Sequence, residues 1–479
     1  MKRFFYWVPL LGLATASFAA DTVNIAPMDF SQARDLAHDR ADMLKIERAE
    51  TARRESEAQS ARSLHGPKLT LDAKQVWGRK TIDYGSVTLG QFMPGAAGQL
   101  GGMASNPQTK PLAEMLGPIF TTPVDLKFTD NLDGPRATVN LEMPIYMGGA
   151  INAKVRASDE AVFESRAQTQ AQRDQIDTEL AQKYFAVQLA RSVVALHQER
   201  VDQQEDELRK ARRFEATGMI SKLERMTVEV NRDAAKRDLL AAQTDCRVAE
   251  AELAGILREE TVGELSDHIF VLTGNIGTLS EWQQKALRAS PVLQSVQAKT
   301  RQADQGVIAA KAAWHPQVYA FGQANLIKHY LAITEPDWIA GIGVKFTLWD
   351  NKDRNAEIAA ARSVVTKAQA AHSEATNRIN TAVETAYLRS SQARDQYRLT
   401  ASTLELAQEN LRLREKAFGE GLSTADEVND ARNKLLGAEV ARRLAAYRFV
   451  AAWAALNGIA GTMNEFVESI TRNDNIIEK

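Results

Sequence analysis

The sequence has very little cysteine and no excess of charge of either sign. Cys246 is the single cysteine among 479 residues, which excludes an internal disulfide framework and any zinc or iron–sulfur site built from several cysteines. The 59 basic and 61 acidic residues leave a formal net charge of −2. A chain with this balance has no general electrostatic attraction to nucleic acid, so no nucleic-acid partner is expected.

Motifs of catalysis are also missing. The chain contains no Walker A loop, no His-Glu-x-x-His and no paired-cysteine metal motif. None of its 7 histidines stands in a recognisable nucleophile–base pattern. The sequence therefore predicts that the protein is not an enzyme, with no catalytic residues, no cofactor and no metal site.

Long apolar runs are absent apart from one at the N-terminus. Lys2 and Arg3 precede an apolar run at 4–14, and a small-x-small cleavage pattern ends at Ala19. This arrangement is typical of a secretory signal peptide, here residues 1–19, and the run is shorter than the roughly twenty residues of a membrane-spanning helix. The mature chain is therefore predicted to leave the cytoplasm.

The remaining sequence repeats itself. With an offset of 203 residues, Gly218 recurs as Gly421. Upstream the offset becomes 249, and Pro67 recurs as Pro316. The change of offset places 46 additional residues in the first half, between Pro67 and Asn152. The chain is therefore predicted to consist of two related halves, the first of which contains an insertion.

Both halves contain the same order of predicted elements. A helix comes first, at 28–64 and 278–314, and ends beside a proline, because a residue before proline avoids the helical region. A strand pair and a long helical hairpin follow. The first repeat is predicted at 20–263, with a long loop at 78–136 that contains one helical turn at 112–116, and a helical hairpin at 149–258. The second repeat is predicted at 264–462, with strands at 316–348 and a helical hairpin at 350–458. A C-terminal tail is predicted at 463–479.

The predicted strands have one apolar and one polar face. Apolar side chains occupy every second position from Val139 to Ile145, and the corresponding residues of the second half, 342–348, keep the same parity. The predicted first helices of the two hairpins are about 70 residues long, or on the order of 100 Å. Helices of that length indicate a coiled coil or the wall of a helical barrel.

This ordered set of features resembles the TolC family of outer-membrane efflux proteins. The resemblance rests on the signal peptide, the tandem repeat, the strand starts at Pro67 and Pro316, the Ile-Tyr-Met-Gly-Gly strand exit at 145–149, and the turn glycines Gly218 and Gly421. It implies a mainly α fold with a transmembrane β part. Three protomers would form an α-helical barrel from their hairpins, and four strands from each would complete one shared twelve-stranded barrel. Such closure satisfies the backbone inside a bilayer.

The resemblance also implies a function and partners. The protein would be a trimeric channel-tunnel, located in the outer membrane of a Gram-negative bacterium with its helices in the periplasm. It would act as the passive exit duct of a tripartite pump that exports small molecules such as drugs. The implied partners are two further copies of the chain, a periplasmic adaptor (membrane fusion protein), an inner-membrane transporter and the lipid of the outer membrane.

Two groups of site residues follow from the resemblance. An acidic pair that narrows the periplasmic entrance in the family matches Glu427 and Asp430, with Asp426 as a further candidate. The adaptor would meet the hairpin turns, at Gly218, Met219, Gly421 and Leu422. The alternative interpretation of the carboxylates is that they only stabilise the start of a helix through its dipole.

Two other functions remain open from the sequence. The same duct could serve type I protein secretion, which these residues do not distinguish from efflux. A protein of a different class, a soluble periplasmic coiled-coil adaptor or scaffold, would have one helical hairpin flanked by small β domains. This sequence instead predicts two hairpins and strand pairs with a lipid-compatible face.

Overall fold

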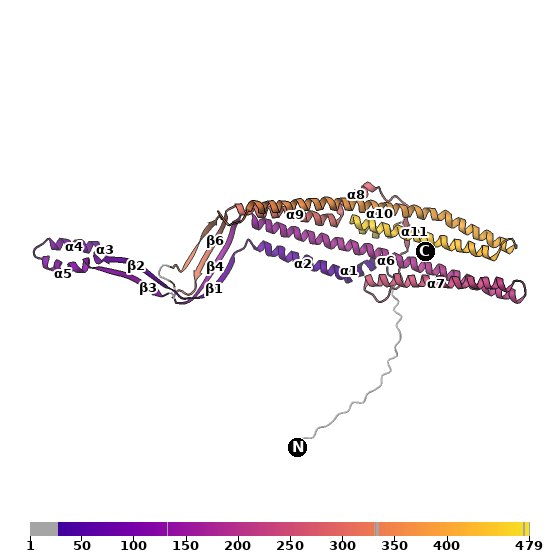
Figure 1. Cartoon of the computed structure of the whole chain (residues 1–479), viewed down its shortest axis with the longest axis horizontal. Coiled ribbons are helices and arrows are strands. Elements are labelled where there is room, and N and C mark those ends of the chain that lie inside the picture. The colour runs from indigo at the N-terminus through magenta and orange to yellow at the C-terminus, as the bar shows by residue number, and fades with distance from the viewer. Residues whose placement is uncertain (1–26, 132, 330, 332–334, 473–474, 479) are drawn as a thin grey trace, which may run out of the picture. The chain divides into compact units, whose positions relative to one another are not determined.

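The computed structural model describes residues 27–131, 133–329, 331, 335–472 and 475–478. The predicted signal peptide, 1–19, lies outside the described residues. The chain divides into two compact units, which are Met1–Arg53, Phe163–Lys299 and Gln369–Lys479 for unit 1, and Arg54–Val162 and Thr300–Ala368 for unit 2. Two long helices, α6 (Ala150–Ala216) and α10 (Arg354–Gly419), contribute to both units (Figure 1).

A four-stranded antiparallel sheet is the centre of unit 2. Its strand order is β1-β4-β6-β7, so β1 and β7 are the edge strands. The bounds are Lys68–Val76 for β1, Gly134–Met147 for β4, Gln317–Asn325 for β6 and Trp338–Lys345 for β7. A short 3-10 turn, η1 (Ala312–Trp314), precedes β6.

One face of this sheet is apolar across all four strands. Leu69 pairs with Leu141, which pairs with Gly322, and Gly322 pairs with Ala340. Trp338, Ile342 and Val344 share that face of β7, and their side chains are exposed. An exposed apolar face on a sheet with two open edges requires both a lipid-like environment and further strands.

The opposite face carries polar side chains and two aromatic rings. Asn140 and its neighbours on β1 lie there, and on β6 the rings of Tyr319 and Phe321 cover the glycines that oppose them on β7. A Cβ atom at Gly343 would lie 2.6 Å from the Tyr319 ring. Glycine is therefore required at position 343 for this ring to lie flat across the neighbouring strand.

The predicted parity is wrong at the end of β4. A bulge between Pro144 and Tyr146 adds one residue to this strand, so that Tyr146 and not Ile145 lies opposite Val318. A bulge reverses which face later side chains occupy. Tyr146 therefore joins the apolar face.

The predicted loop at 78–136 is also wrong, because this segment is regular. Two strands, β2 (Arg79–Thr88) and β3 (Pro123–Asn131), pair as an antiparallel ribbon. Between them lie three helices, which are α3 (Leu89–Phe92), α4 (Pro94–Ala104) and α5 (Lys110–Thr121). The single helical turn predicted at 112–116 is part of α5.

The first helix of each repeat is broken in two, where one helix was predicted. In the first repeat α1 (Phe30–Arg40) and α2 (Asp42–Ser63) are separated by Ala41, whose backbone is extended. In the second repeat, α8 (Leu279–Ala289) and α9 (Pro291–Lys311) are separated by Ser290, because a residue before proline avoids the helical region.

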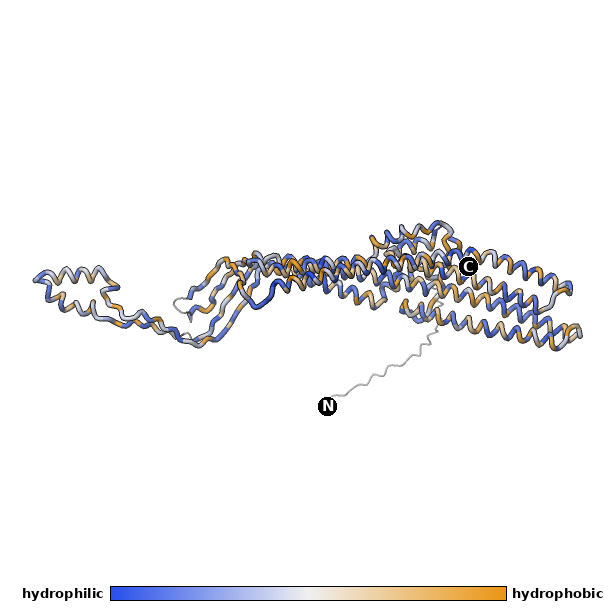
Figure 2. Tube along the Cα trace, turned by 45° about the horizontal axis from the view of Figure 1, so that its top comes forward, coloured by the Kyte–Doolittle hydropathy of each residue, from blue (hydrophilic) through white to orange (hydrophobic). Residues whose placement is uncertain are grey.

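The core of unit 1 is built from helices of both repeats. The hairpin helices are α6 with α7 (Lys222–Leu257) and α10 with α11 (Ala425–Ala460). Polar and apolar residues alternate in short intervals along them (Figure 2). Phe30 lies at the centre, with ring-centroid distances of 5.7 Å to Tyr184 and 5.5 Å to Phe466.

The predicted C-terminal tail at 463–479 is structured over most of its length. Helix α12 (Met463–Ile470) buries Phe466 in this core, and β8 (Asn475–Glu478) pairs with β5 (Ile269–Leu272), whose side chains are all buried. The C-terminal segment is therefore packed into unit 1.

A group of charged side chains is buried where α1 meets α6. Asp177 is fully buried and accepts hydrogen bonds from Arg34 Nε at 2.8 Å and His38 Nε2 at 2.6 Å. One turn away, Asp174 is 5% exposed, and its Oδ1 accepts a hydrogen bond from Gln170 at 2.9 Å. Burial, strengthened by the charge of Asp177 and opposed by Arg34 and His38, raises the pKa of Asp174 to about 6.

Asp174→Asn is expected to raise the apparent Tm at neutral pH and to flatten its pH dependence. The folded state binds the Asp174 proton more tightly than the unfolded state, so this carboxyl makes the native protein more stable as the pH falls through about 6. Its ionisation costs roughly 2–3 kcal/mol at neutral pH, because the pKa of Asp174 lies about two units above its usual value and each unit corresponds to about 1.4 kcal/mol. The measurement is thermal unfolding in detergent between pH 5 and 8, with Asp35→Asn, on the exposed side of α1, as the control. Parallel pH profiles for wild type and Asp174→Asn would contradict this assignment.

Candidate functional site at the helical hairpin tips

The first hairpin turns at a glycine in a left-handed conformation. Gly218 has φ of +73° and lies two residues after the end of α6. The Met219 amide donates to the Phe214 carbonyl at 2.8 Å, and the Gly218 amide donates to the Glu215 carbonyl at 3.0 Å. These two bonds form a Schellman motif, which needs a residue that tolerates positive φ. Met219 is left 70% exposed at the tip.

The second hairpin turns in the same way. Gly421 has φ of +73°, the Leu422 amide donates to the Ala417 carbonyl at 2.8 Å, and the Gly421 amide donates to the Phe418 carbonyl at 3.0 Å. Leu422 is 77% exposed. The four turn residues that the sequence singled out therefore form two equivalent, exposed tips, each with one apolar side chain at its end.

The helix after each turn begins with a capping box. At the first tip, Ser221 accepts from the Glu224 amide at 3.2 Å while the Ser221 amide donates to the Glu224 carboxylate at 2.7 Å. At the second tip, Thr424 and Glu427 exchange the corresponding bonds at 3.3 and 3.0 Å. Glu224 and Glu427 are therefore equivalent residues, and both satisfy backbone donors at a helix start.

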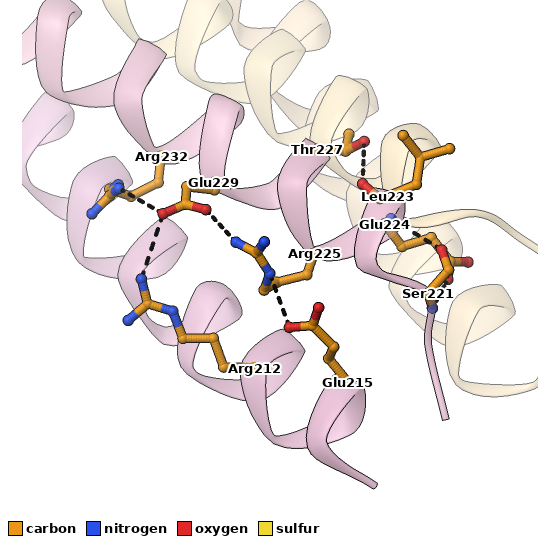
Figure 3. Close-up of polar contacts among 9 residues, drawn as sticks. All are labelled: Arg212, Glu215, Ser221, Leu223, Glu224, Arg225, Thr227, Glu229 and Arg232. Atoms are coloured by element: carbon orange, nitrogen blue, oxygen red, sulfur yellow. Dashed lines mark hydrogen bonds and ion pairs between the residues drawn. The ribbon is translucent and has the colours of Figure 1, made fainter. Parts of the chain in front are cut away.

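Ion pairs connect α6 with α7 just behind the first tip (Figure 3). Arg225 of α7 lies 2.9 Å from Glu215 of α6 and also contacts Glu229, one turn further along α7. Glu229 in turn is 3.6 Å from Arg212 of α6 and 3.7 Å from Arg232. Because these side chains are linked in a network, they hold the two helices of the first hairpin in register more firmly than an isolated surface pair would.

The three candidate gate residues have different surroundings. Besides its capping bonds, Glu427 accepts a hydrogen bond from Ser423 at 2.5 Å and pairs with Arg414 at 3.2 Å. The Ser423 hydroxyl and the backbone donor hold the pKa of Glu427 below its usual range. Asp430, one turn later, is exposed, with Lys434 3.9 Å away, and Asp426 is exposed in the first turn of α11. Glu427 and Asp430 therefore lie on the same end of α11, Glu427 held by several short contacts and Asp430 by one long ion pair.

Sequence reasoning missed a polar layer between the two hairpins. Arg200 of α6 is only 7% exposed and donates to the side chains of Asn429 and Asn433 of α11. Gln204, fully buried, donates to Asn429 at 3.3 Å. Burial, together with the charge of Arg432, lowers the pKa of Arg200 to about 10. The sequence signal that could have indicated this layer is the spacing of its residues. Arg200 and Gln204 of α6 are four residues apart, as are Asn429 and Asn433 of α11, and residues four apart lie on one face of a helix.

Arg432 connects the same two hairpins nearer the tips. It extends from α11 to Glu415 of α10 at 2.7 Å and also contacts Glu207 of α6. The first and second hairpins are therefore joined by polar contacts over the last turns before the tips. Water can replace hydrogen bonds of this kind, so a polar interface separates more readily than an apolar interface does.

The described part of the chain contains no group of three or more His, Cys, Asp or Glu side chains placed to hold a metal ion. Burial raises the pKa of the Cys246 thiol, which makes the thiolate scarce at neutral pH. Among the described helices, none combines the length and the apolar composition that a membrane span requires.

Two tandem helical hairpins with a strand sheet that is apolar on one exposed face define an outer-membrane channel-tunnel. Residues 33–257 and 282–462 match the sequence profile of the outer membrane efflux protein family. The chain belongs to this family, and it is a channel component of the outer membrane with a helical periplasmic part, not an enzyme. A comparison with curated protein sequences gave no match.

Solved structures with the same fold come from several bacteria. The CmeC outer membrane channel of Campylobacter jejuni is 14% identical, with a TM-score of 0.67 over 97% of this chain and 98% of that one. The outer membrane protein VceC of Vibrio cholerae is 14% identical, with a TM-score of 0.65 over 90% and 96%. A membrane protein of Pseudomonas aeruginosa is 14% identical, with a TM-score of 0.68 over 90% and 93%. These similarities confirm the predicted fold class.

Proposed function

We propose that the protein is the passive exit duct of a tripartite efflux pump that exports small molecules such as drugs, and that it works as a homotrimer. The observation that carries this proposal is the sheet β1-β4-β6-β7, which has an apolar exposed face and two open edges. Three copies joined edge to edge close such a sheet into a barrel, with the apolar face toward lipid and the polar face around a lumen.

The hairpin tips are the proposed contact with a periplasmic adaptor. Met219 and Leu422 present an exposed apolar side chain at equivalent positions, on turns fixed by Gly218 and Gly421. A small apolar contact on a rigid turn suits a partner that approaches end-on, because little conformational entropy is lost on binding. An inner-membrane transporter would supply the energy for export.

Glu427 and Asp430 are the proposed entrance. Three copies of this pair on one axis would place six carboxylates around a narrow opening, which attracts multivalent cations. Asp426, exposed one residue before Glu427, is the next candidate if this pair does not form the ring. The bonds from Ser423 and Thr424 favour the ionised form of Glu427 in each protomer, and so favour a charged ring at neutral pH.

The double substitution Glu427→Gln with Asp430→Asn is expected to abolish block by trivalent cations from the periplasmic side. Glutamine keeps the capping box, since either Glu or Gln serves there, so the charge is removed and the helix start is retained. The measurement is planar-bilayer conductance of the purified protein with a trivalent cobalt complex. The matched control is Glu224→Gln, which removes the equivalent charge at the first tip and should leave the block unchanged.

Three results would contradict these assignments. Unchanged block in the double variant would return Glu427 to a purely capping role and make Asp426 the next residue to test. Unchanged drug susceptibility of cells lacking the protein, together with loss of a secreted polypeptide, would favour type I protein secretion through the same duct. Release of the protein from membranes by salt without detergent would contradict a channel altogether.

A further inference from the structure

The insertion in the first repeat ends in a nearly uncharged helical cap, residues 89–121. It contains α3, α4 and α5 at the end of the β2–β3 ribbon (Figure 1). No charged residue occurs from 89 to 109. The two charged residues of the cap, Lys110 and Glu114, lie one turn apart on α5 and are 3.9 Å from each other. The cap therefore presents no net charge to any partner.

One face of α5 is apolar and exposed. Leu112, Met115 and Ile119 follow one another at helical spacing and are 45%, 66% and 56% exposed. Phe92 and Met93 of the α3–α4 junction are 63% and 52% exposed. Exposed apolar surface of this extent on a structured element is typical of an interaction site.

Helix α4 adds an open backbone surface to this cap. Apart from neighbouring residues and the backbone of α4 itself, a Cβ atom built at Gly95, Gly98, Gly101 or Gly102 would have no atom within 4 Å. Glycine is a poor helix former, so a helix with this composition depends on packing for its stability. The open glycine side allows another helix to approach the α4 backbone closely.

The strands place this cap at the exterior end of the duct. β1 ends at Val76 and β2 begins at Arg79, while β3 ends at Asn131 and β4 begins at Gly134, so the ribbon continues the first two barrel strands. At the opposite strand ends, α6 follows β4 and α10 follows β7. A cap reached from the far ends of the strands therefore lies across the membrane from the periplasmic helices.

We propose that the three helical caps of the trimer pack on one another through Leu112, Met115 and Ile119, and form an apolar lid at the exterior mouth. This inference rests on the proposed trimeric duct. Three caps held by one barrel meet at an effective concentration on the order of millimolar, so a modest apolar contact suffices. Copies of one uncharged surface can pack on one another without opposite charges. Adhesion to anionic lipid uses exposed Lys or Arg instead, and the only Lys of the cap is paired with Glu114.

A spin label at position 115 tests the lid in the complete protein in lipid nanodiscs. Met115→Cys is labelled in a Cys246→Ala background, and its collisions with oxygen and with a water-soluble nickel chelate are measured by EPR. Burial between caps makes the label inaccessible to both reagents and gives short distances between labels. The control is Thr121→Cys, on the opposite side of α5, where the label should stay accessible to nickel. Adding Ile119→Asp to the Met115→Cys protein should restore nickel access.

Each other result overturns the lid. High oxygen access without nickel access would place α5 in lipid, and high nickel access would leave it in water. The mass of the detergent-solubilised particle, measured by light scattering, distinguishes failure of the lid from failure of the trimeric duct. A monomer would contradict the proposed duct as well, whereas a trimer with an accessible label would contradict only the lid.

Discussion

Leu141→Arg is expected to prevent stable insertion of the trimer into the outer membrane. Leu141 lies midway along β4, on the apolar face between Leu69 and Gly322, and an arginine there would point into hydrocarbon. Arginine on the lipid face near the bilayer midplane costs about 2–4 kcal/mol for each copy, and the trimer incurs that cost three times. The measurement is the yield of heat-modifiable trimer in purified outer membranes.

The neighbouring residue supplies the matched control. Asn140 precedes Leu141 on the same strand, faces the lumen and is hydrogen-bonded to Asp72 of β1. Asn140→Arg should be tolerated, because the lumen is wet and Asp72 offers the new guanidinium a partner. If Asn140→Arg blocks insertion and Leu141→Arg does not, the sheet faces are reversed with respect to lipid.

Asp177→Ala is expected to destabilise the helical unit by about 3 kcal/mol. The carboxylate of Asp177 is fully buried between Arg34 and His38, and it ties α1 to α6. Removing one partner of a buried charged group leaves the others unpaired, which typically costs 3–5 kcal/mol. The lower end applies here because Arg34 keeps 22% exposure of its side chain. Chemical denaturation of the detergent-solubilised protein, followed by circular dichroism, measures the loss.

A second aspartate on α6 provides the comparison. Asp159 pairs with Arg62 at 2.7 Å, but these side chains are 35% and 64% exposed. Asp159→Ala should cost no more than about 1 kcal/mol, because surface ion pairs contribute little. Equal losses for the two alanine variants would show that burial does not distinguish the two pairs.

The parts of the fold with a local signal could be predicted from the sequence. Gly218 and Gly421 stop two long helical runs, and the same offset that relates them relates the residues around them. Alternation around Leu141 indicated a strand with two different faces, and the structure has one there. These features depend on neighbours in the chain, so a periodic pattern is enough to find them.

The parts that failed depend on contacts distant in sequence. The 78–136 segment is rich in Gly and Pro, which indicates a loop. In the structure, however, Ile82 of β2 pairs with Phe128 of β3. Pairing between residues so far apart in the sequence produces no local pattern that could predict it. At the candidate site, the acidic pair Glu427 and Asp430 was predicted from the family resemblance, whereas Arg200 was missed. From the sequence alone, Arg200 has the pattern of a surface residue on a long polar helix, because it is buried only by contact with the second hairpin.

Aromatic residues lie near both ends of the apolar face of the sheet. Trp338 begins β7, and Phe346 follows its last residue with the same parity. Eight residues of strand span about 27 Å, and a strand tilt of about 40° reduces this to roughly 20 Å along the membrane normal. Tyr146, brought onto this face by the bulge in β4, lies near the Phe346 end. This spacing matches a thin hydrophobic layer, so a thicker bilayer would have to compress around the barrel. The depth of the barrel in the bilayer, and with it the level at which the long helices begin, is therefore expected to depend on the aromatic side chains at the two ends of the apolar face.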